Sequence, residues 1–124
     1  MQEHFRQFDV GPDPFERTWK VSFRWLQVGI SIRHADTIDV KFILQPNDGP
    51  EEEKVIALPH AALLDVARRR HRVLTDAWSM KLASLHIRRM ILTAEDMEKT
   101  VVTLSAAEIE ERDRELYGEA VATA

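Results

Sequence analysis

Residues 18–33 read TWKVSFRWLQVGISIR, and this stretch decides the fold because its hydrophobic residues recur with the period of a β-strand. Between Trp19 and Trp25 every second residue is apolar, which is typical of a strand with one buried face. From Leu26 to Ile32 the alternation continues in the opposite phase. A reversal of phase within one strand indicates a β-bulge or a change in the face that is covered.

Further strands are expected on the C-terminal side of this segment. Residues 37–45 alternate in the same way, and the short connection at residues 34–36 predicts an antiparallel hairpin. The sequence PNDGP at residues 46–50 is typical of a turn. We expect residues 54–58 to form a third strand and residues 100–104 to form a short fourth one.

The second half of the chain is predicted to be mostly helical. Pro59 suits the first position of a helix, and apolar residues with helical spacing extend from about His60 to Asp76. Residues 79–94 fit either a helix or a strand with another reversal of phase. We predict a helix there, because no Gly or Pro lies between Pro59 and Gly118 to break one.

The last helix has the clearest start signal. Residues 105–108 read SAAE, which matches a capping box and predicts a helix from Ala106 to about Tyr117. The VVTLS sequence at residues 101–105 echoes VIALP at residues 55–59, since each apolar run leads into a predicted helix. The echo indicates either a duplication or two ordinary helix starts, and we favour the second explanation.

Together these elements predict an α+β protein. We expect a curved antiparallel sheet, with three N-terminal strands plus a short C-terminal strand, covered by two to three helices. Residues 1–17 are expected to form an extended N-terminal arm, residues 18–118 a single α+β domain, and residues 119–124 a flexible C-terminal tail. Such a sheet leaves an open edge, which a second copy of the chain could pair with.

The composition excludes several kinds of site. The chain has no cysteine, which rules out disulfides, thiolate zinc sites and cysteine nucleophiles. Hydrophobic residues make up 44% of the chain, enough to form a core. Its first residues do not look like a secretory signal, and no apolar stretch approaches the ~20 residues that span a bilayer. We therefore expect a cytoplasmic protein that does not bind membranes.

The charge is distributed unevenly along the chain. The net charge of −4 argues against a general nucleic-acid binder. Between Arg68 and Arg89 there are seven basic residues and one acidic residue, whereas between Ala94 and Glu119 there are nine acidic and three basic residues. These two segments, with charges of +6 and −6, could face each other within one chain or across a dimer interface.

The candidate binding residues are six arginines on the two predicted middle helices: Arg68, Arg69, Arg70, Arg72, Arg88 and Arg89. Such a cluster can form a patch for an anion or nucleic acid, or a solvated helix face paired with Asp65. Arg70 differs because helical spacing places it near the centre of the apolar stripe. It either extends to water along its aliphatic stem, forms a buried ion pair, or lines a pocket for an anion.

Histidine spacing does not indicate a metal site. The i, i+4 pair typical of zinc ligands is missing among His4, His34, His60, His71 and His86. A small enzyme could use His34, Asp36 or His86 as an acid or base, but the chain lacks the nucleophile-elbow, Walker and dinucleotide motifs. We therefore assign no catalytic residue, metal ligand or cofactor, and expect that the protein is not an enzyme.

The aromatic residues of the first long strand raise a further possibility. Trp19, Phe23 and Trp25 lie near Lys20 and Arg24, a combination found on platforms that bind single-stranded nucleic acid. Strict alternation would put the aromatic rings on the face opposite the basic side chains, so we expect the rings to pack in the core.

These observations favour a non-enzymatic interaction module that forms a homodimer. The alternative is a protein that binds an anionic small ligand or single-stranded nucleic acid through its basic helix face. A small enzyme is the third and least favoured hypothesis.

Overall fold

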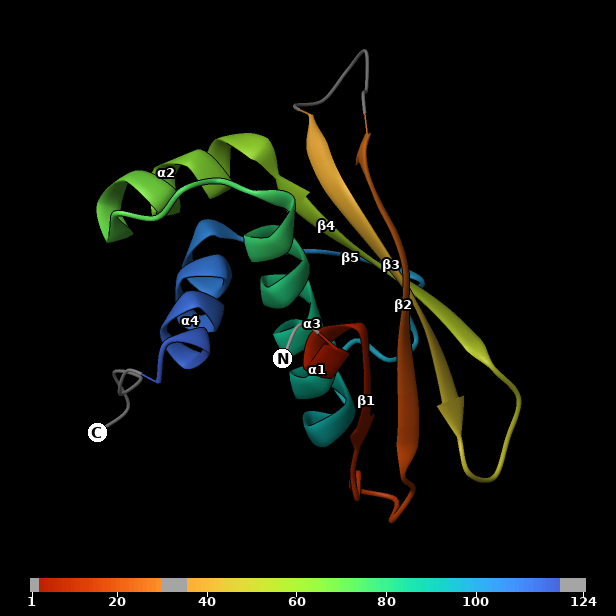
Figure 1. Ribbon diagram of the computed structural model, residues 1–124. Helices are drawn as coiled ribbons and strands as arrows, with labels where there is room; N and C mark the ends of the chain where they lie inside the picture. The colour runs from red at the N-terminus through yellow and green to blue at the C-terminus, as the bar shows by residue number, and fades with distance from the viewer. Residues whose placement is uncertain (1–2, 30–35, 119–124) are drawn as a thin grey trace.

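One five-stranded sheet organises the protein, and its strands follow one another in chain order (Figure 1). The computed structural model of the protein describes residues 3–29 and 36–118. The strands are β1 (Gln7–Val10), β2 (Trp19–Gly29), β3 (Thr37–Pro46), β4 (Glu52–Pro59) and β5 (Val101–Thr103). Neighbours from β1 to β4 are antiparallel, whereas β5 is parallel to β4.

The predicted α+β class is confirmed, with two differences in the sheet. It has a fifth strand, β1, and the pairing of β5 with β4 is parallel rather than antiparallel. Parallel pairing requires a long crossover connection between the two strands, and here α2 and α3 form that connection between β4 and β5.

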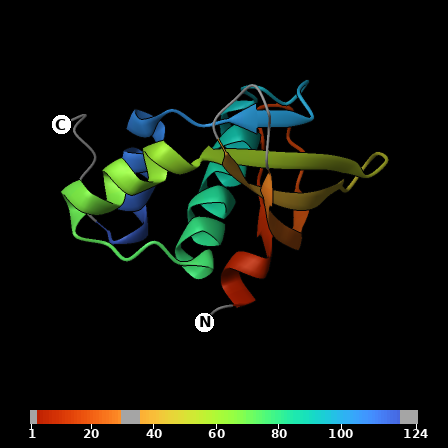
Figure 2. The ribbon, with the colours of Figure 1, turned by 90° about the horizontal axis from the view of Figure 1, so that it is seen from above.

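The helices gather on one side of the sheet, as the view from above shows (Figure 2). They are α1 (Glu3–Arg6), α2 (His60–Arg70), α3 (Asp76–Thr93) and α4 (Ala106–Leu116). The long helix α3 contributes ten buried residues, more than any other described helix, and forms the centre of the helical layer. Its apolar face joins Val21, Val40 and Phe42 of the sheet in one hydrophobic core. No helix in the described ranges is long and apolar enough to cross a membrane.

The N-terminal segment is part of the sheet rather than only an extended arm. Residues 7–10 form β1 and pair with β2, and one helical turn, α1, precedes them. Phe5 and Phe8 pack against the core, whereas Phe15 is 68% exposed. The strand β1 has only four residues, of which Phe8 and Val10 are apolar, and this is too short a pattern to reveal the strand in the sequence.

The helix predicted from about His60 to Asp76 is wrong in its C-terminal third. The helix α2 ends at Arg70, and His71 adopts a left-handed conformation with φ of 58°. The amide of Arg72 donates to the carbonyl of Ala67, closing the end of the helix. A new helix then begins with Thr75 as its N-cap, whose hydroxyl accepts from the amide of Trp78.

Two other helix predictions are confirmed. Residues 79–94 are helical apart from Ala94, which ends α3 in the left-handed region with φ of 61°. The capping box at the start of α4 is complete, because Ser105 and Glu108 exchange hydrogen bonds between side chain and backbone.

A β-bulge accounts for the reversal of phase in β2. Phe23 pairs with Phe42 and Trp25 pairs with the adjacent Lys41, so Arg24 is the inserted residue. Trp25 therefore lies on the sheet face away from the helices, beside Lys41, whose Nζ lies 5.8 Å from the centre of the indole ring. The expectation that Trp25 packs in the core is wrong, whereas Trp19 is fully buried.

The two echoing segments lie side by side. Val55, Ile56 and Ala57 of β4 pair in parallel with Val101, Val102 and Thr103 of β5. Each strand leads into a helix, α2 or α4. The sequence echo therefore marks two adjacent strand-to-helix units that pack together.

Candidate functional site

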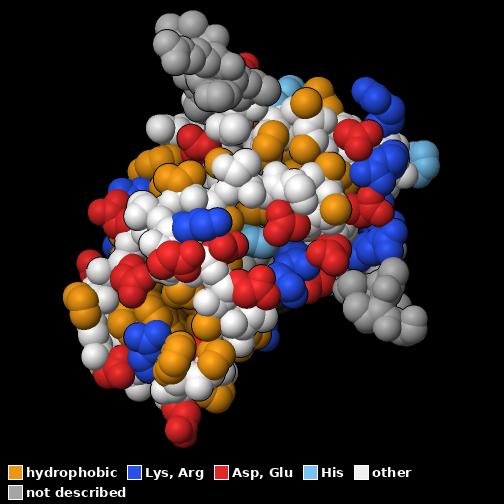
Figure 3. All heavy atoms as spheres, turned by 180° about the vertical axis from the view of Figure 1, so that it is seen from behind, with side chains coloured by type: hydrophobic (Ala, Val, Ile, Leu, Met, Phe, Trp, Pro, Cys, Tyr) orange, Lys and Arg blue, Asp and Glu red, His pale blue; other side chains and the backbone are white. Residues whose placement is uncertain are grey.

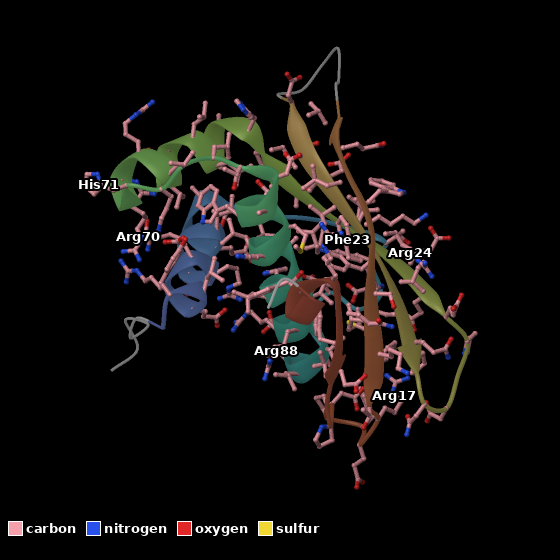
Figure 4. The ribbon with its side chains drawn as sticks, viewed as in Figure 1. Arg17, Phe23, Arg24, Arg70, His71 and Arg88 are labelled. Carbon is pink, nitrogen blue, oxygen red and sulfur yellow. The ribbon has the colours of Figure 1, made fainter. Side chains whose placement is uncertain are left out.

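The most deeply buried charged group of the helical layer is the carboxylate of Asp113 on α4. Its Oδ2 accepts from Nε of Arg70 at 2.9 Å, and both of its oxygens lie 3.1 Å from Nε of Arg72. Its Oδ1 also accepts from Nε1 of Trp78 at 2.9 Å. Figure 4 shows Arg70 at the end of α2, beside α4. Arg70 is therefore in a mostly buried ion pair, one of the alternatives left open above.

This cluster ties together four parts of the chain. Arg70 belongs to α2, Arg72 to the link before α3, Trp78 to the first turn of α3, and Asp113 to α4. Arg72 also lies over the ring of Tyr117, with its guanidinium carbon 3.7 Å from the ring centre. The hydrogen-bond donors of Arg70 and Arg72 thus hold the fold together.

The remaining candidate arginines are scattered. Arg69 forms ion pairs with Glu110 and Asp65. Its hydrogen bonds to Glu110 and Asp65 raise the pKa of Arg69, and they outweigh desolvation, which lowers it. Arg89 lies 3.7 Å from Glu95 in an exposed pair. Arg68 is exposed at the end of α2, and Arg88 lies apart from Arg70 on α3 (Figure 4). The structure does not bring these six residues together on one surface.

The oppositely charged segments face each other within the chain. Arg69, Arg70 and Arg72 all contact acidic residues of α4. Figure 3 shows acidic and basic side chains interspersed on the back of the molecule. Of the two arrangements expected from the sequence, the intramolecular one is observed.

The histidines do not form a cluster in the described part of the chain. His34 and the side chain of His4 lie outside it, His60 and His71 are exposed, and His86 is buried. Within residues 3–29 and 36–118, no three His, Asp or Glu side chains are arranged to hold a metal ion.

His86 lies at the bottom of a small hollow between α3 and α4. Its side chain is 3% exposed, and its Nδ1 has no hydrogen-bond partner among the described residues. Burial lowers the pKa of His86 to about 4; Glu108 and Asp96 raise it, while Arg112 and Arg89 lower it further. The hollow measures ≈ 50 Å³, which holds little more than a water molecule.

Sequence reasoning missed Asp113 and Arg112. Arg112 is 2% exposed, with Nε 3.1 Å from an oxygen of Glu115. The signal that could have found both residues is their spacing from Ile109, because positions i, i+3 and i+4 share one face of a helix. Placing α4 with its capping box would have put both charges on its buried side.

A different feature is open to a partner: one edge of the sheet. β1 pairs only with Trp19–Ser22 of β2, whereas β3 pairs with β2 as far as Gly29. On its β1 side, the segment Phe23–Gly29 has no partner strand among the described residues, and we call this segment the open edge of β2. Figure 1 shows β2 extending well beyond β1. Val28 within it is 61% exposed.

A groove of ≈ 470 Å³ runs beside the open edge. One wall is the β2 edge, and the other is the first turns of α3. Arg6 also borders the groove, with its guanidinium carbon 5.3 Å from the centre of the Phe23 ring. The lining residues are Arg6, Phe23, Trp25, Leu26, Asp76, Ala77 and Met80.

The arrangement of an open strand edge beside a helix can accept an extended chain. Unpaired backbone groups of the edge supply hydrogen bonds, and the groove takes alternate side chains of the added strand.

No protein-family model matches the sequence, and neither a curated protein nor a solved structure is significantly similar to it.

Proposed function

We propose that this protein is a non-enzymatic interaction module that forms a homodimer through the open edge of β2. The observation that carries the proposal is the pairing of β2, which is continuous with β3 but stops at Ser22 on the other side. An unpaired strand edge is a template for another strand. Exposed Val28, Trp25 and the adjoining groove add apolar surface that a second chain can cover.

The internal ion pairs change the expected character of the dimer. The +6 and −6 segments are engaged with each other inside one chain, so they supply little attraction between copies. Dimerisation through strand pairing and apolar contact is therefore expected to be insensitive to salt. The same ion pairs leave the basic helix face a weaker candidate for binding an anion or nucleic acid, because four of its six arginines are paired with acidic residues: Arg69, Arg70, Arg72 and Arg89.

The experiment measures molar mass by light scattering and sedimentation over a wide concentration range. A strand edge of this length forms a small interface, so the range should extend to about 1 mM. The wild-type mass should rise from one copy to two, equally at low and high salt. A mass of one copy throughout would overturn the proposal.

A matched pair of variants identifies the surface. Val28→Lys places a charge on the open edge of β2 and should abolish dimerisation. Val101→Lys makes the same change at a similarly exposed valine of β5, at the opposite edge of the sheet, and should leave the dimer intact. The reverse outcome would assign the contact to β5. Circular dichroism of both variants verifies that they remain folded.

A further inference from the structure

We infer that two copies pair their β2 strands antiparallel, with Gln27 on the two-fold axis. This inference rests on the proposed homodimer and specifies its register. The bulge at Arg24 interrupts β2, and from Trp25 to Gly29 the strand pairs residue for residue with β3. Within the described residues, the regular part of the open edge is therefore Trp25–Gly29, and its middle residue is Gln27.

Antiparallel pairing of a strand with its own copy matches residues equally distant from the axis. With Gln27 on the axis, Leu26 faces Val28 of the partner copy, and Trp25 faces Gly29 of the partner copy. Apolar side chains then meet apolar side chains, and an indole ring covers a residue without a side chain. The two Gln27 amides face each other and can exchange hydrogen bonds.

Charge also favours this register. The segment from Trp25 to Gly29 contains no charged residue, so two copies meet there without like-charge repulsion. A shift by one residue that puts Leu26 on the axis would set Arg24 against Val28 and bring the bulge into the contact. The register centred on Gln27 avoids both costs.

The groove completes the contact. Leu26 and Val28 pair with the buried Val40 and Ile38 of β3, which places them on the helix side of the sheet. An axis perpendicular to the sheet keeps the helices of both copies on this side. Val28 of the partner copy, opposite Leu26, then enters the groove beside Met80. The exposed Val28 of each copy is thereby buried in the dimer.

Charge variants at Gln27 test the register. Gln27→Lys alone and Gln27→Glu alone each place like charges opposite one another on the axis, and should each weaken dimerisation by roughly tenfold. An equimolar mixture should form a heterodimer, detected by native mass spectrometry. Within one chain the variants act oppositely, because Gln27 pairs with Asp39. If both variants dimerise weakly alone and form a heterodimer when mixed, the cause is therefore charge repulsion at the axis and not a change in the stability of the chain.

The control is the same pair of substitutions at Thr103, an exposed residue of β5. Neither Thr103→Lys nor Thr103→Glu should alter dimerisation. A wild-type dimer that tolerates both charges at Gln27 would overturn the register while leaving the homodimer in place. A wild-type monomer would overturn both, and would leave the open edge to an extended segment of another protein.

Because the chain has no cysteine, a second test is free of background. Gln27→Cys should form a covalent dimer under mild oxidation, since the two residues face each other on the axis. Asp48→Cys, in the exposed turn between β3 and β4, should not. A disulfide at Asp48→Cys alone would contradict the inferred axis.

Discussion

Nε of Arg70 lies 2.9 Å from Oδ2 of Asp113, although 43 residues separate them in the sequence. Arg72 and Trp78 donate to the same carboxylate. One buried acid thereby fixes the end of α2, the start of α3 and the inner face of α4. The basic run that suggests a binding surface in the sequence is largely a structural element.

Asp113→Asn should destabilise the protein by about 3–5 kcal/mol, because it removes the buried negative charge that two mostly buried guanidinium groups share. The amide also offers one acceptor oxygen where the carboxylate uses two. Urea unfolding followed by tryptophan fluorescence measures the loss.

Asp65→Asn is the matched control, since Asp65 pairs with Arg69 on the exposed surface of α2. It should cost no more than about 0.5 kcal/mol. Equal losses in the two variants would contradict a special role for the buried cluster.

Ala94→Gly should stabilise the protein by about 0.5 kcal/mol. Ala94 has φ of 61°, a conformation that costs an alanine ~1–2 kcal/mol but a glycine almost nothing. Part of this gain is offset because glycine gains freedom in the unfolded chain. The change is measured as a shift in the midpoint of thermal unfolding.

The same substitution at Ala61 should have the opposite sign. Ala61 is exposed in the first turn of α2, where glycine costs up to about 1 kcal/mol relative to alanine. Destabilisation of both variants would show that the end of α3 is not strained at Ala94.

These helix ends explain where prediction from sequence fails. Alternation predicted β2 to β4, and the capping box predicted the start of α4, because each signal is local. The break at His71 uses left-handed backbone at a residue other than glycine, so the absence of glycine is misleading there. The start of α3 at Thr75, whose hydroxyl accepts from the amide of Trp78, is not among the sequence predictions.

The candidate site was less predictable than the fold. Helical spacing singled out Arg70, but its partner lies on a helix that reaches it only through the parallel placement of β5. The open edge of β2 depends on how far β1 extends, which the weak pattern of residues 7–10 does not reveal. The partner of Arg70 and the open edge of β2 both depend on pairing between distant parts of the chain, whereas periodicity indicates only local structure.

Asp13 should make the stability of the protein fall steeply at very acid pH. Burial alone would raise the pKa of Asp13, but hydrogen bonds from Trp19, Arg17 and Phe15 outweigh it and lower the pKa from 3.8 to about 2. The contribution is therefore present above pH 3.8 and is lost as the pH falls towards 2. Urea unfolding between these values measures the loss.

The Asp13→Asn variant should lack this part of the pH dependence, so its stability should approach that of the wild type as the pH falls. Trp19→Phe removes one of the donors to Oδ2 and should raise the pKa of Asp13, measured from the carboxyl chemical shift. An unchanged carboxyl titration in Trp19→Phe would show that this indole bond does not control Asp13.

Protonation of His86 should destabilise the protein at a higher pH than protonation of Asp13 does. Burial comes first among the causes that lower its pKa from 6.5 to about 4. The facing groups are Glu108, Glu111 and Arg112 on α4, together with Arg89, Glu95 and Asp96. Between these two pH values the unfolded chain binds a proton that the folded chain does not, so stability falls as the pH falls from 6.5 to 4.

The full loss should approach about 3 kcal/mol below pH 4, at 1.36 kcal/mol for each unit of pKa. His86→Gln removes the titrating group and should flatten the dependence in this window, whereas His71→Gln, which replaces an exposed histidine, controls for the substitution itself. Urea unfolding at intervals from pH 4 to pH 7 measures all three proteins. If His86→Gln loses as much stability as the wild type over this range, the acid sensitivity lies elsewhere, and His86 accepts its proton without opening the contact between α3 and α4.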